Sequence, residues 1–496
     1  MRANKNKLST GALACMTRME AAALPQAVIE NFLRLYALVE EGRTGIISEA
    51  EISPVASLDR YEDIIKDPEL RRLGQAVLPE LVVCKLNGGL GTGMGLERAK
   101  SLLEVRRGLT FNHVVAEQLM QWREKTGIEI PLLHMTSFNT EHDIAAFMEG
   151  YPALRISGLP SYFNQHKHPK IYSDTLMPAE EAEEALNWNP PGHGDLYAAL
   201  VSTGTLSRLI AAGKKYIFVS NSDNLGATPD LAILGYLAAK RLPFLLEVAE
   251  RTPADRKGGH LALRKADNRL VLREAAQAPQ DTEGSPCAEF QDIERYRYFN
   301  SNSEWGELEA WQRVAEANGG VIPLALIRNE KTVNPRDARS RRVYQIETAM
   351  GAAIEVFPGA GALVIPRSRF SPVKATNDLL GVRSDAYTLG ADQRLALAGA
   401  RETVGPPVIN LDQRYYRLID DFDARFRVIP SLACAREFSV CGDFVFNSAL
   451  TICGRVVISD ERSLPEKTVF DPAISELVDE KFALTDQGAL RTKFGS

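Results

Sequence analysis

The segment LVVCKLNGGLGTGMG, residues 81–95, decides the fold. It opens with Leu81–Leu86, an apolar run of the length of a buried strand. Five glycines then fall within residues 88–95, and glycine-rich backbone is costly unless a loop needs positive φ angles or a close approach to a ligand. Backbone N–H groups in such a loop can bind a phosphate or the edge of a base. We therefore expect a nucleotide-binding loop that follows a strand and leads towards a helix.

This loop matches neither of the two common glycine-rich nucleotide motifs. A Walker loop ends in Gly-Lys-Ser/Thr, which is not found here at the required spacing. In the dinucleotide fingerprint G-x-G-x-x-G, the third glycine position would be occupied by Met94 or Leu96. The loop thus argues against P-loop ATPases and ordinary dehydrogenases.

Short apolar runs alternate with helical patterns on the C-terminal side of the loop. The predicted strands are Leu81–Leu86, Pro131–Ser137, Tyr216–Ser220 and Pro243–Ala249. The predicted helices are His113–Lys125, Leu206–Ala212 and Leu231–Lys240. A hairpin, His260–Arg264 with Arg269–Ala275, is expected to turn at Asp267–Asn268. Strands that alternate with helices predict an α/β fold, Rossmann-like, with a mixed but mostly parallel sheet covered on both faces.

The two ends of the chain differ from this central part. Residues 1–75 are expected to form a helical N-terminal segment, because apolar side chains recur at helical spacing in Ala27–Glu41. Near the C-terminus, apolar residues recur every six positions, at Val440, Phe446, Ile452 and Ile458. This period favours a parallel β-helix over an antiparallel meander. We expect a catalytic domain at residues 76–400, a linker at 400–407 and a β-helix domain at 407–496.

The composition bounds the function only loosely. The chain has 496 residues and a formal net charge of −6 at pH 7, which argues against a nucleic-acid-binding protein. No uninterrupted apolar stretch approaches the ~20 residues that span a bilayer, and the apolar run after the basic start Met1–Lys5 is too short for a signal peptide. The six cysteines form no C-x-x-C pair and no zinc-site spacing. We expect a protein of the reducing cytoplasm that binds neither nucleic acid nor membrane.

A carboxylate follows the predicted strand Tyr216–Ser220, in the sequence Asn221–Ser222–Asp223–Asn224. Ligands bind at the carboxyl ends of strands in open α/β sheets. Mg²⁺ typically takes one or two protein carboxylates and completes its shell with water and substrate phosphate. Asp223 is therefore a candidate Mg²⁺ ligand. Taken alone, the motif fits a turn-forming or helix-capping aspartate better.

Two further loops carry side chains suited to anions. His193 stands between two glycines in Pro190–Asp195, which lets the backbone and the imidazole approach a ligand closely. A second loop follows the apolar strand Gly361–Ile365 and carries three cations: Arg367, Arg369 and Lys374. Cations on a backbone stiffened by prolines suit a pyrophosphate, although a surface basic cluster would give the same pattern.

In order along the chain, these four motifs resemble those of the eukaryotic-type UTP–glucose-1-phosphate uridylyltransferases, or UDP-glucose pyrophosphorylases. Other matching stretches are Ser137–Thr140, Phe163–Gln165, Lys257–Gly259, Phe299–Asn302 and Glu347–Ile354. The resemblance implies a nucleotidyltransferase α/β domain with a C-terminal β-helix. It also implies a Mg²⁺-dependent reaction in which UTP and glucose 1-phosphate give UDP-glucose and pyrophosphate. Residues 1–75 match only loosely.

The resemblance also implies roles for single residues. The uridine end of UTP would be bound by Leu86, Asn87, Gly88 and Gly89, with Gln165 and Gly192 completing the uracil pocket. Asp223 would hold Mg²⁺. The phosphates would be bound by Lys100 and Lys374, of which Lys374 is the residue that the family treats as catalytic.

The resemblance also implies which residues bind the sugar part of the substrate. His193 would contact glucose 1-phosphate, while Gly88, Gly89, Asn221, Ser222 and Asp223 would line the sugar nucleotide. Hydroxyl groups of glucose would be recognised by Glu274, Asn300 and Asn302. A departure from the family occurs at Leu96–Lys100, where eukaryotic members commonly read Cys-Lys-Gly-Pro-Lys. Glu97 thus replaces a lysine, and Arg98 is a candidate substitute for it.

Three other functions compete with this one. The same chemistry on another sugar 1-phosphate is the nearest, although relatives specific for N-acetylhexosamines tend to carry Ala-Gly-Gly-Gln where this chain has Asn87–Leu90. Glycosyltransferases that consume UDP-sugars generally carry Asp-x-Asp, unlike the sequence around Asp223. An inactive UDP-sugar sensor need not keep both Lys100 and Lys374. The C-terminal domain also offers an edge through which the chain could form a homo-oligomer.

Overall fold

The structure is a computed structural model that describes residues 8–106, 108–282 and 284–494. Residues 1–7 of the expected N-terminal segment lie outside the described part. The chain divides into two compact units. The first comprises the residues up to Gly88, 126–221 and 229–367, and the second comprises 89–125, 222–228 and the residues from Ser368 onward. The boundaries expected from the sequence at 76, 400 and 407 stay a prediction.

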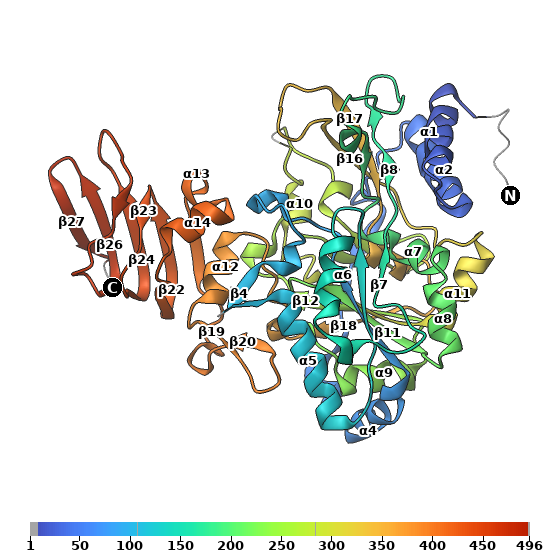
Figure 1. The fold of residues 1–496 in the computed structure, drawn as a ribbon, viewed down its shortest axis with the longest axis horizontal. Coiled ribbons are helices and arrows are strands. Elements are labelled where there is room, and N and C mark those ends of the chain that lie inside the picture. The colour runs from blue at the N-terminus through green and yellow to red at the C-terminus, as the bar shows by residue number, and fades with distance from the viewer. Residues whose placement is uncertain (1–7, 107, 283, 495–496) are drawn as a thin grey trace. The chain divides into compact units, whose positions relative to one another are not determined.

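The first unit is built on one mixed sheet (Figure 1). Its strand order is β2 (Asp59–Arg60), β18 (Gly361–Ile365), β12 (Phe244–Glu250), β15 (Tyr298–Glu307), β11 (Tyr216–Asn221), β3 (Leu81–Leu86), β6 (Leu132–Thr136) and β7 (Tyr162–Asn164). Among these eight strands, only β15 runs antiparallel to its neighbours, which are β11 and β12. The expected mixed, mostly parallel sheet is confirmed.

Most predicted elements of this unit lie within one residue of the observed ones. The strands β3, β6, β11 and β12 agree to that extent, as do the helices α8 (Thr205–Ala211) and α9 (Leu231–Lys240). The predicted hairpin is present as β13 (His260–Arg264) and β14 (Leu270–Arg273), with Asn268 at φ 55° in its turn. The other elements are α3 (Tyr61–Ile64), α4 (Pro68–Val77), α6 (Glu141–Glu149), α7 (Leu196–Ser202), α10 (Ala288–Gln291), α11 (Leu308–Ala317), β1 (Ile52–Pro54), β8 (His168–Pro169) and β10 (Trp188–Asn189).

The N-terminal residues contribute two helices, α1 (Thr10–Ala21) and α2 (Gln26–Glu40). Their buried side chains form one cluster with residues such as Trp188 and Ile346. The Tyr36 hydroxyl donates to the Leu176 carbonyl at 2.7 Å and ties α2 to a distant loop. Beside this cluster lies a small sheet of β9 (Ile171–Tyr172), β17 (Arg342–Glu347) and β16 (Ile327–Thr332). The expected helical segment is therefore an integral part of the first unit.

The second unit contains a parallel β-helix (Figure 1). Its main sheet pairs β21 (Val408–Leu411), β22 (Ser431–Cys441), β24 (Thr451–Asp460) and β26 (Glu476–Thr485) in parallel, and β27 (Gly488–Lys493) closes it antiparallel. A second face pairs β23 (Phe444–Val445) with β25 (Thr468–Val469), also in parallel. The four residues at six-residue spacing are all buried: Val440, Phe446, Ile452 and Ile458. The parallel β-helix is confirmed over the antiparallel meander.

The rest of the second unit differs from expectation at one place. The glycine-rich loop passes through two short 3₁₀ turns, η3 (Thr92–Met94) and η4 (Lys100–Leu102), and a hairpin of β4 (Glu104–Arg106) and β5 (Leu109–Thr110) before α5 (Phe111–Thr126). Gly91 and Gly95 have φ of 69° and 76°, which interrupts a right-handed helix. The remaining elements are α12 (Thr376–Arg383), β19 (Tyr387–Leu389), β20 (Leu395–Leu397), α13 (Gln413–Tyr416) and α14 (Ile419–Arg425). Among the described residues, no helix is both long and apolar enough to cross a membrane.

A buried carboxyl group on β15 makes the stability of the first unit depend on pH. Glu304 is fully buried and accepts a hydrogen bond from the Tyr197 hydroxyl at 2.7 Å. Burial raises the pKa of Glu304 to about 8 from the ordinary value of 4.5. Between these two values the folded protein keeps a proton that the unfolded chain has lost, so stability falls as the pH rises through this window.

We predict that Glu304→Gln removes this loss, because the amide stays neutral at every pH. The thermal unfolding midpoint of the variant, measured from pH 5 to pH 9, should rise relative to that of the wild type as the pH increases. Other titrating groups are common to both proteins and cancel in the difference. Parallel curves for the two proteins would contradict the prediction.

Candidate functional site

The candidate residues of the first unit begin at the carboxyl ends of two neighbouring strands. β3 and β11 pair in parallel, and their last residues, Leu86 and Asn221, lie opposite each other in register. The loops that follow, at Asn87 and at Ser222, therefore leave the sheet from the same edge. This is the edge at which α/β sheets bind ligands, as the sequence predicted.

Asn87, Gly88 and Gln165 come together at this edge. The Asn87 amide nitrogen donates to the Lys85 carbonyl at 3.1 Å and lies 2.7 Å from Nδ1 of His134. Gly88 accepts a hydrogen bond from the Ser137 hydroxyl at 2.8 Å through its carbonyl oxygen. A Cβ added to Gly88 would lie 2.5 Å from Nε2 of Gln165. The Gln165 amide thus lies directly against the Gly88 backbone.

The Asn87 side chain keeps unused hydrogen-bonding capacity. Burial lowers the pKa of His134 to about 3, so its imidazole is neutral and can accept from the Asn87 amide. The Asn87 Oδ1 atom is buried and has no hydrogen-bond partner among the described residues. Such an atom costs free energy unless a ligand or water satisfies it.

His193 is held as a neutral donor. Gly192, before it, has a φ of 82°, and a Cβ there would lie 2.4 Å from the Thr348 carbonyl oxygen, so only glycine fits. The Met350 N–H donates to Nδ1 of His193 at 2.9 Å. Desolvation lowers the pKa of His193 to about 4. Because Nδ1 accepts, the single proton resides on Nε2, which can donate to an anionic oxygen.

Glu274, Asn300 and Asn302 form one hydrogen-bonded cluster. The Asn300 amide nitrogen donates to Glu274 at 3.1 Å and to Oδ1 of Asn302 at 2.8 Å. The Asn302 N–H donates back to Oδ1 of Asn300 at 2.9 Å, and Asn302 adopts a φ of 53°. Gly259 allows close approach, since a Cβ there would lie 2.5 Å from Oε2 of Glu274. Amide and carboxylate groups fixed in this way suit the recognition of sugar hydroxyl groups.

The candidate residues of the second unit centre on an ion pair. Lys100 Nζ lies 2.6 Å from Oδ2 of Asp223, and the two side chains are only 19% and 17% exposed. The other carboxylate oxygen, Oδ1, is buried and without a hydrogen-bond partner among the described residues. The Lys100 N–H donates to the Gly89 carbonyl at 3.1 Å and closes the glycine-rich loop. Asp223 thus presents one unpaired oxygen beside a positive charge.

Lys374 is tied to this pair through its backbone. The N–H of Val373 donates to the Asp223 carbonyl at 3.2 Å. The Asp378 carboxylate accepts the N–H groups of Lys374 and Ala375 at 2.7 and 2.9 Å. Partial desolvation raises the pKa of Asp378, and the nearby charges of Lys374 and Lys100 oppose this rise. Both ammonium groups therefore lie within electrostatic range of one carboxylate.

Asp378, which holds the Lys374 backbone, was not predicted from the sequence. It stands at the third position of α12, where an acidic side chain commonly caps the helix N-terminus. An acidic residue at this position can indicate a helix N-terminus. The signal is weak here because the residue before the helix is Ala375 rather than a serine or threonine.

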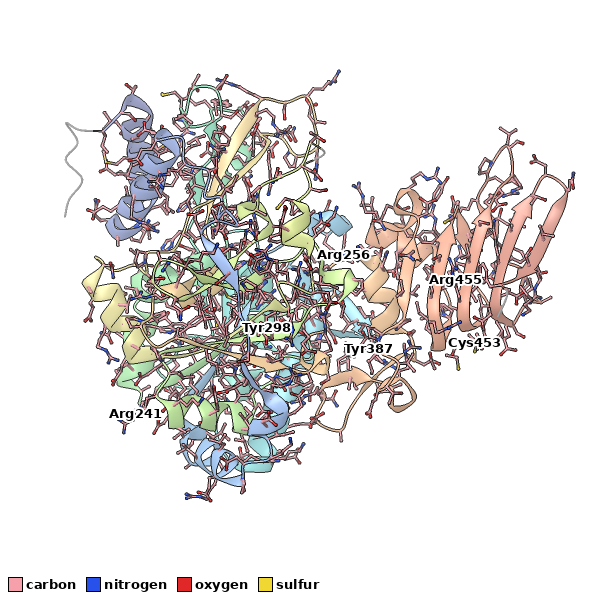
Figure 2. The ribbon with its side chains drawn as sticks, turned by 180° about the vertical axis from the view of Figure 1, so that it is seen from behind. Arg241, Arg256, Tyr298, Tyr387, Cys453 and Arg455 are labelled. Carbon is pink, nitrogen blue, oxygen red and sulfur yellow. The ribbon has the colours of Figure 1, made fainter. Side chains whose placement is uncertain are left out.

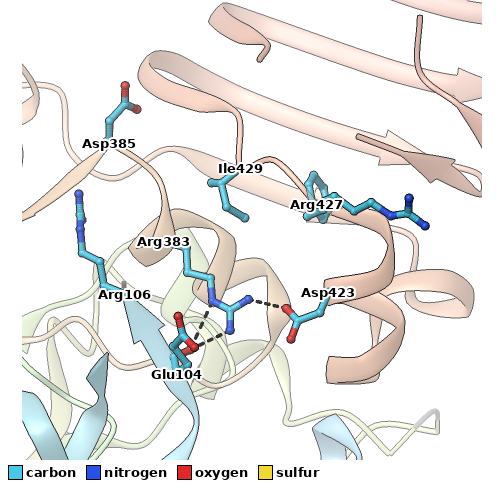
Figure 3. A pocket seen from close by; sticks show the side chains of 8 residues that line it. Glu104, Arg106, Arg383, Asp385, Asp423, Arg427 and Ile429 are labelled. Atoms are coloured by element: carbon cyan, nitrogen blue, oxygen red, sulfur yellow. Dashed lines mark hydrogen bonds and ion pairs between the residues drawn. The ribbon is translucent and has the colours of Figure 1, made fainter. Parts of the chain in front are cut away.

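The other end of α12 is also anchored (Figure 3). Arg106 donates to the carbonyls of Val382, Ser384 and Tyr387. Arg383 donates to the Glu104 carbonyl at 2.8 Å and pairs with Asp423 of α14. Glu104, Arg106, Arg383 and Asp423 also line a cavity of about 580 Å³. The helix that holds the Lys374 backbone is therefore fixed at both ends.

The predicted residues thus fall into two groups on different units. The first unit carries Leu86, Asn87, Gly88, Gln165, Gly192, His193, Asn221, Glu274, Asn300 and Asn302, and the second carries Gly89, Lys100, Ser222, Asp223 and Lys374. The two arginines before Lys374 serve structural roles: Arg369 is buried and donates to the Thr228 carbonyl at 3.0 Å, and Arg367 pairs with Asp255. Glu97 and Arg98 are both exposed.

Comparison with known proteins places this chain in a family. The family model described as UTP–glucose-1-phosphate uridylyltransferase matches residues 29–452. The chain belongs to this family. A member from Solanum tuberosum is 38% identical over 408 residues, covering 82% of this chain and 81% of the relative. One from Saccharomyces cerevisiae is 37% identical over 457 residues, covering 90% and 87%.

Solved structures in the family share the fold. The UDP-glucose phosphorylase of Trypanosoma brucei is 41% identical, with a TM-score of 0.87 over 96% of this chain and 100% of that protein. The UDP-glucose pyrophosphorylase of Leishmania major, solved in open and closed structures, is 39% identical, with a TM-score of 0.89 over the same shares. A variant of that enzyme in complex with UDP-glucose is 40% identical, with a TM-score of 0.88. The α/β nucleotidyltransferase fold is therefore confirmed for this member.

We predict that Asp378→Ala loosens the Lys374 backbone, because the substitution removes the acceptor of two N–H groups. Hydrogen–deuterium exchange of a peptide covering residues 371–378 should be about tenfold faster or more. Asp378→Asn keeps one acceptor oxygen, so its exchange rate should lie between those of the wild type and of Asp378→Ala. Unchanged exchange in Asp378→Ala would show that the carboxylate does not hold the loop.

Proposed function

We propose that this protein joins UTP and glucose 1-phosphate to give UDP-glucose and pyrophosphate, as a Mg²⁺-assisted uridylyltransferase. Its membership of a family described by that activity supports the proposal. The observation that carries it is the Lys100–Asp223 pair with Lys374 on an adjoining, hydrogen-bonded loop. This arrangement offers two cations and a carboxylate for phosphate and metal.

The chemistry requires charge neutralisation more than proton transfer. The phosphate of glucose 1-phosphate is anionic near neutral pH, so it needs no general base to act as a nucleophile. The barrier arises from repulsion between this anion and the α-phosphate of UTP. Fixed positive charges that hold nucleophile and leaving group in line lower such a barrier. Lys100 and Lys374 would supply these charges. The four motifs contain no serine or cysteine nucleophile paired with a base.

The residues that would hold Mg²⁺ fit the ion. Oδ1 of Asp223 is a buried carboxylate oxygen that lacks a partner within the described part of the chain. No cluster of three or more metal-ligating side chains occurs among the described residues, and Mg²⁺ held largely by substrate phosphate and water needs only one or two carboxylates. Bound there, the ion would neutralise phosphate charge and orient the leaving pyrophosphate.

We assign the remaining residues by their chemistry. Leu86, Asn87, Gly88 and Gly89 would bind uridine together with Gln165 and Gly192. The Nε2–H of His193 would donate to the phosphate of glucose 1-phosphate. Asn221 and Ser222 would line the sugar nucleotide, and the cluster of Glu274, Asn300 and Asn302 would bind glucose hydroxyl groups.

Assembly and location are further parts of the proposal. We propose a cytoplasmic enzyme with a helical segment at 1–75, a catalytic domain at 76–400 and a β-helix at 407–496. Strand β27 is exposed along its whole length and forms the last strand of its sheet. An open edge of this kind could pair with a second copy of the chain.

We predict that Lys374→Ala lowers kcat by about 10²–10³, the scale of a lost electrostatic donor in catalysis. Steady-state kinetics with UTP and glucose 1-phosphate would measure the loss, and circular dichroism would show that the fold is intact. A rate within tenfold of wild type would remove Lys374 from the catalytic role.

The substrate itself is tested by pyrophosphate release from UTP and Mg²⁺ with glucose 1-phosphate, beside galactose 1-phosphate, N-acetylglucosamine 1-phosphate and no sugar. We expect release to favour glucose 1-phosphate strongly and to stop when EDTA removes the metal. Preference for another sugar would keep the mechanism and change the substrate. UDP-glucose binding without any release would make the protein a sensor.

A further inference from the structure

The β-helix brings together two cysteines that the sequence keeps apart. Cys434 on β22 and Cys453 on β24 carry free thiols and lie opposite each other in register. Side chains of directly opposed residues in neighbouring strands point to the same face. Neighbouring strands are about 4.8 Å apart, which lies within the Cα–Cα range of disulfide-bonded cysteines. This spacing is compatible with a disulfide between the two residues.

Solvent reaches this pair. Cys434 is exposed and Cys453 is partly exposed. In Figure 2, Cys453 lies close to Arg455, on the same strand of the β-helix. By contrast, Cys15 and Cys84 are buried. Neither Cys434 nor Cys453 has a part in the proposed nucleotidyl transfer.

A positive charge lies beside Cys434. The Arg401 guanidinium is buried and donates to the carbonyls of Leu432, Ala433 and Ala435, which flank Cys434, at 3.2, 3.0 and 2.6 Å. Arg401 also interacts electrostatically with the Cys434 thiol. The positive charge thus lies beside the sulfur atom that would attack a small disulfide.

The partner thiol, Cys453, is surrounded by groups that disfavour its thiolate. Burial, the adjacent Cys434 thiol and the carboxylates of Glu476 and Asp479 raise the pKa of Cys453 to about 11. Cys453 is therefore protonated near neutral pH. An accessible, reactive thiol next to a second thiol is the arrangement found in redox-sensitive cysteine pairs.

We propose that Cys434 and Cys453 form a redox-reactive dithiol, which small disulfides such as oxidised glutathione convert into an intramolecular disulfide. The Cys434 thiolate attacks one sulfur of oxidised glutathione, forms a mixed disulfide and releases one glutathione. Cys453 then loses its proton and attacks Sγ of Cys434, which forms the Cys434–Cys453 bond and releases the second glutathione. Two protein thiols are oxidised, and one glutathione disulfide is reduced to two thiols.

Cys441 provides a matched control within the same strand. It is exposed, like Cys434, but its register partner on β24 is Ser459. Glutathione attached to Cys441 thus has no thiol opposite to displace it. Cys441 should keep its mixed disulfide under conditions in which Cys434 loses it.

The test uses the full-length, reduced protein titrated with oxidised glutathione, then alkylated, digested with trypsin and analysed by mass spectrometry. Trypsin cuts after Arg427, Arg436 and Arg455, so the proposed disulfide joins the peptides 428–436 and 437–455. Cys441→Ser leaves Cys453 as the single cysteine of the second peptide. We expect the linked peptides in the wild type and in Cys441→Ser. In Cys453→Ser, Cys434 should instead retain glutathione, as Cys441 does.

Two results would overturn the proposal. One is stable glutathione on Cys434 while Cys453 is still a free thiol, because the second attack would then not occur. The other is an unmodified Cys434 in wild-type protein whose Cys441 is fully modified. Both are measured in the wild type and so do not depend on the folding of a variant.

Discussion

The ion pair between Lys100 and Asp223 is the interaction on which the candidate chemistry of the second unit depends. Both side chains are largely removed from water, and such a pair is costly to break because removing one partner leaves the other charge uncompensated. The same residues also organise the backbone around them: the N–H of Lys100 closes the glycine-rich loop on Gly89, and the carbonyl of Asp223 accepts the N–H of Val373. Three distant segments, ending at Lys100, Asp223 and Lys374, thereby meet at one place.

Several peptide bonds at which the chain passes from one unit to the other lie among the candidate residues. The chain passes between the units at Gly88–Gly89, at Asn221–Ser222 and at Arg367–Ser368, among other places. The first two of these peptide bonds lie directly after β3 and β11, whose last residues are register partners. Each of these two bonds therefore joins candidate residues of both units, Gly88 to Gly89 and Asn221 to Ser222.

Local patterns in the sequence were sufficient for most of the fold. Buried strands such as β3 and β11 are largely apolar runs, and the residues at six-residue spacing around Ile452 are all buried in the β-helix. Contacts between residues far apart in the chain could not be predicted from the sequence. The Glu274–Asn300 hydrogen bond and the pairing of Cys434 with Cys453 depend on strand register, which no single stretch encodes. Arg367 and Arg369 looked like ligands because their distant partners, Asp255 and Thr228, could not be seen.

The central claim is a single, direct displacement between two anions, assisted by fixed cations. The stereochemistry at phosphorus tests it most directly. UTP made chiral at its α-phosphorus by one sulfur atom would be reacted with glucose 1-phosphate, and the configuration of the UDP-glucose product would be determined by ³¹P NMR. One in-line displacement predicts inversion at this phosphorus. Retention would require two displacements through a covalent uridylyl-enzyme, and it would contradict the account.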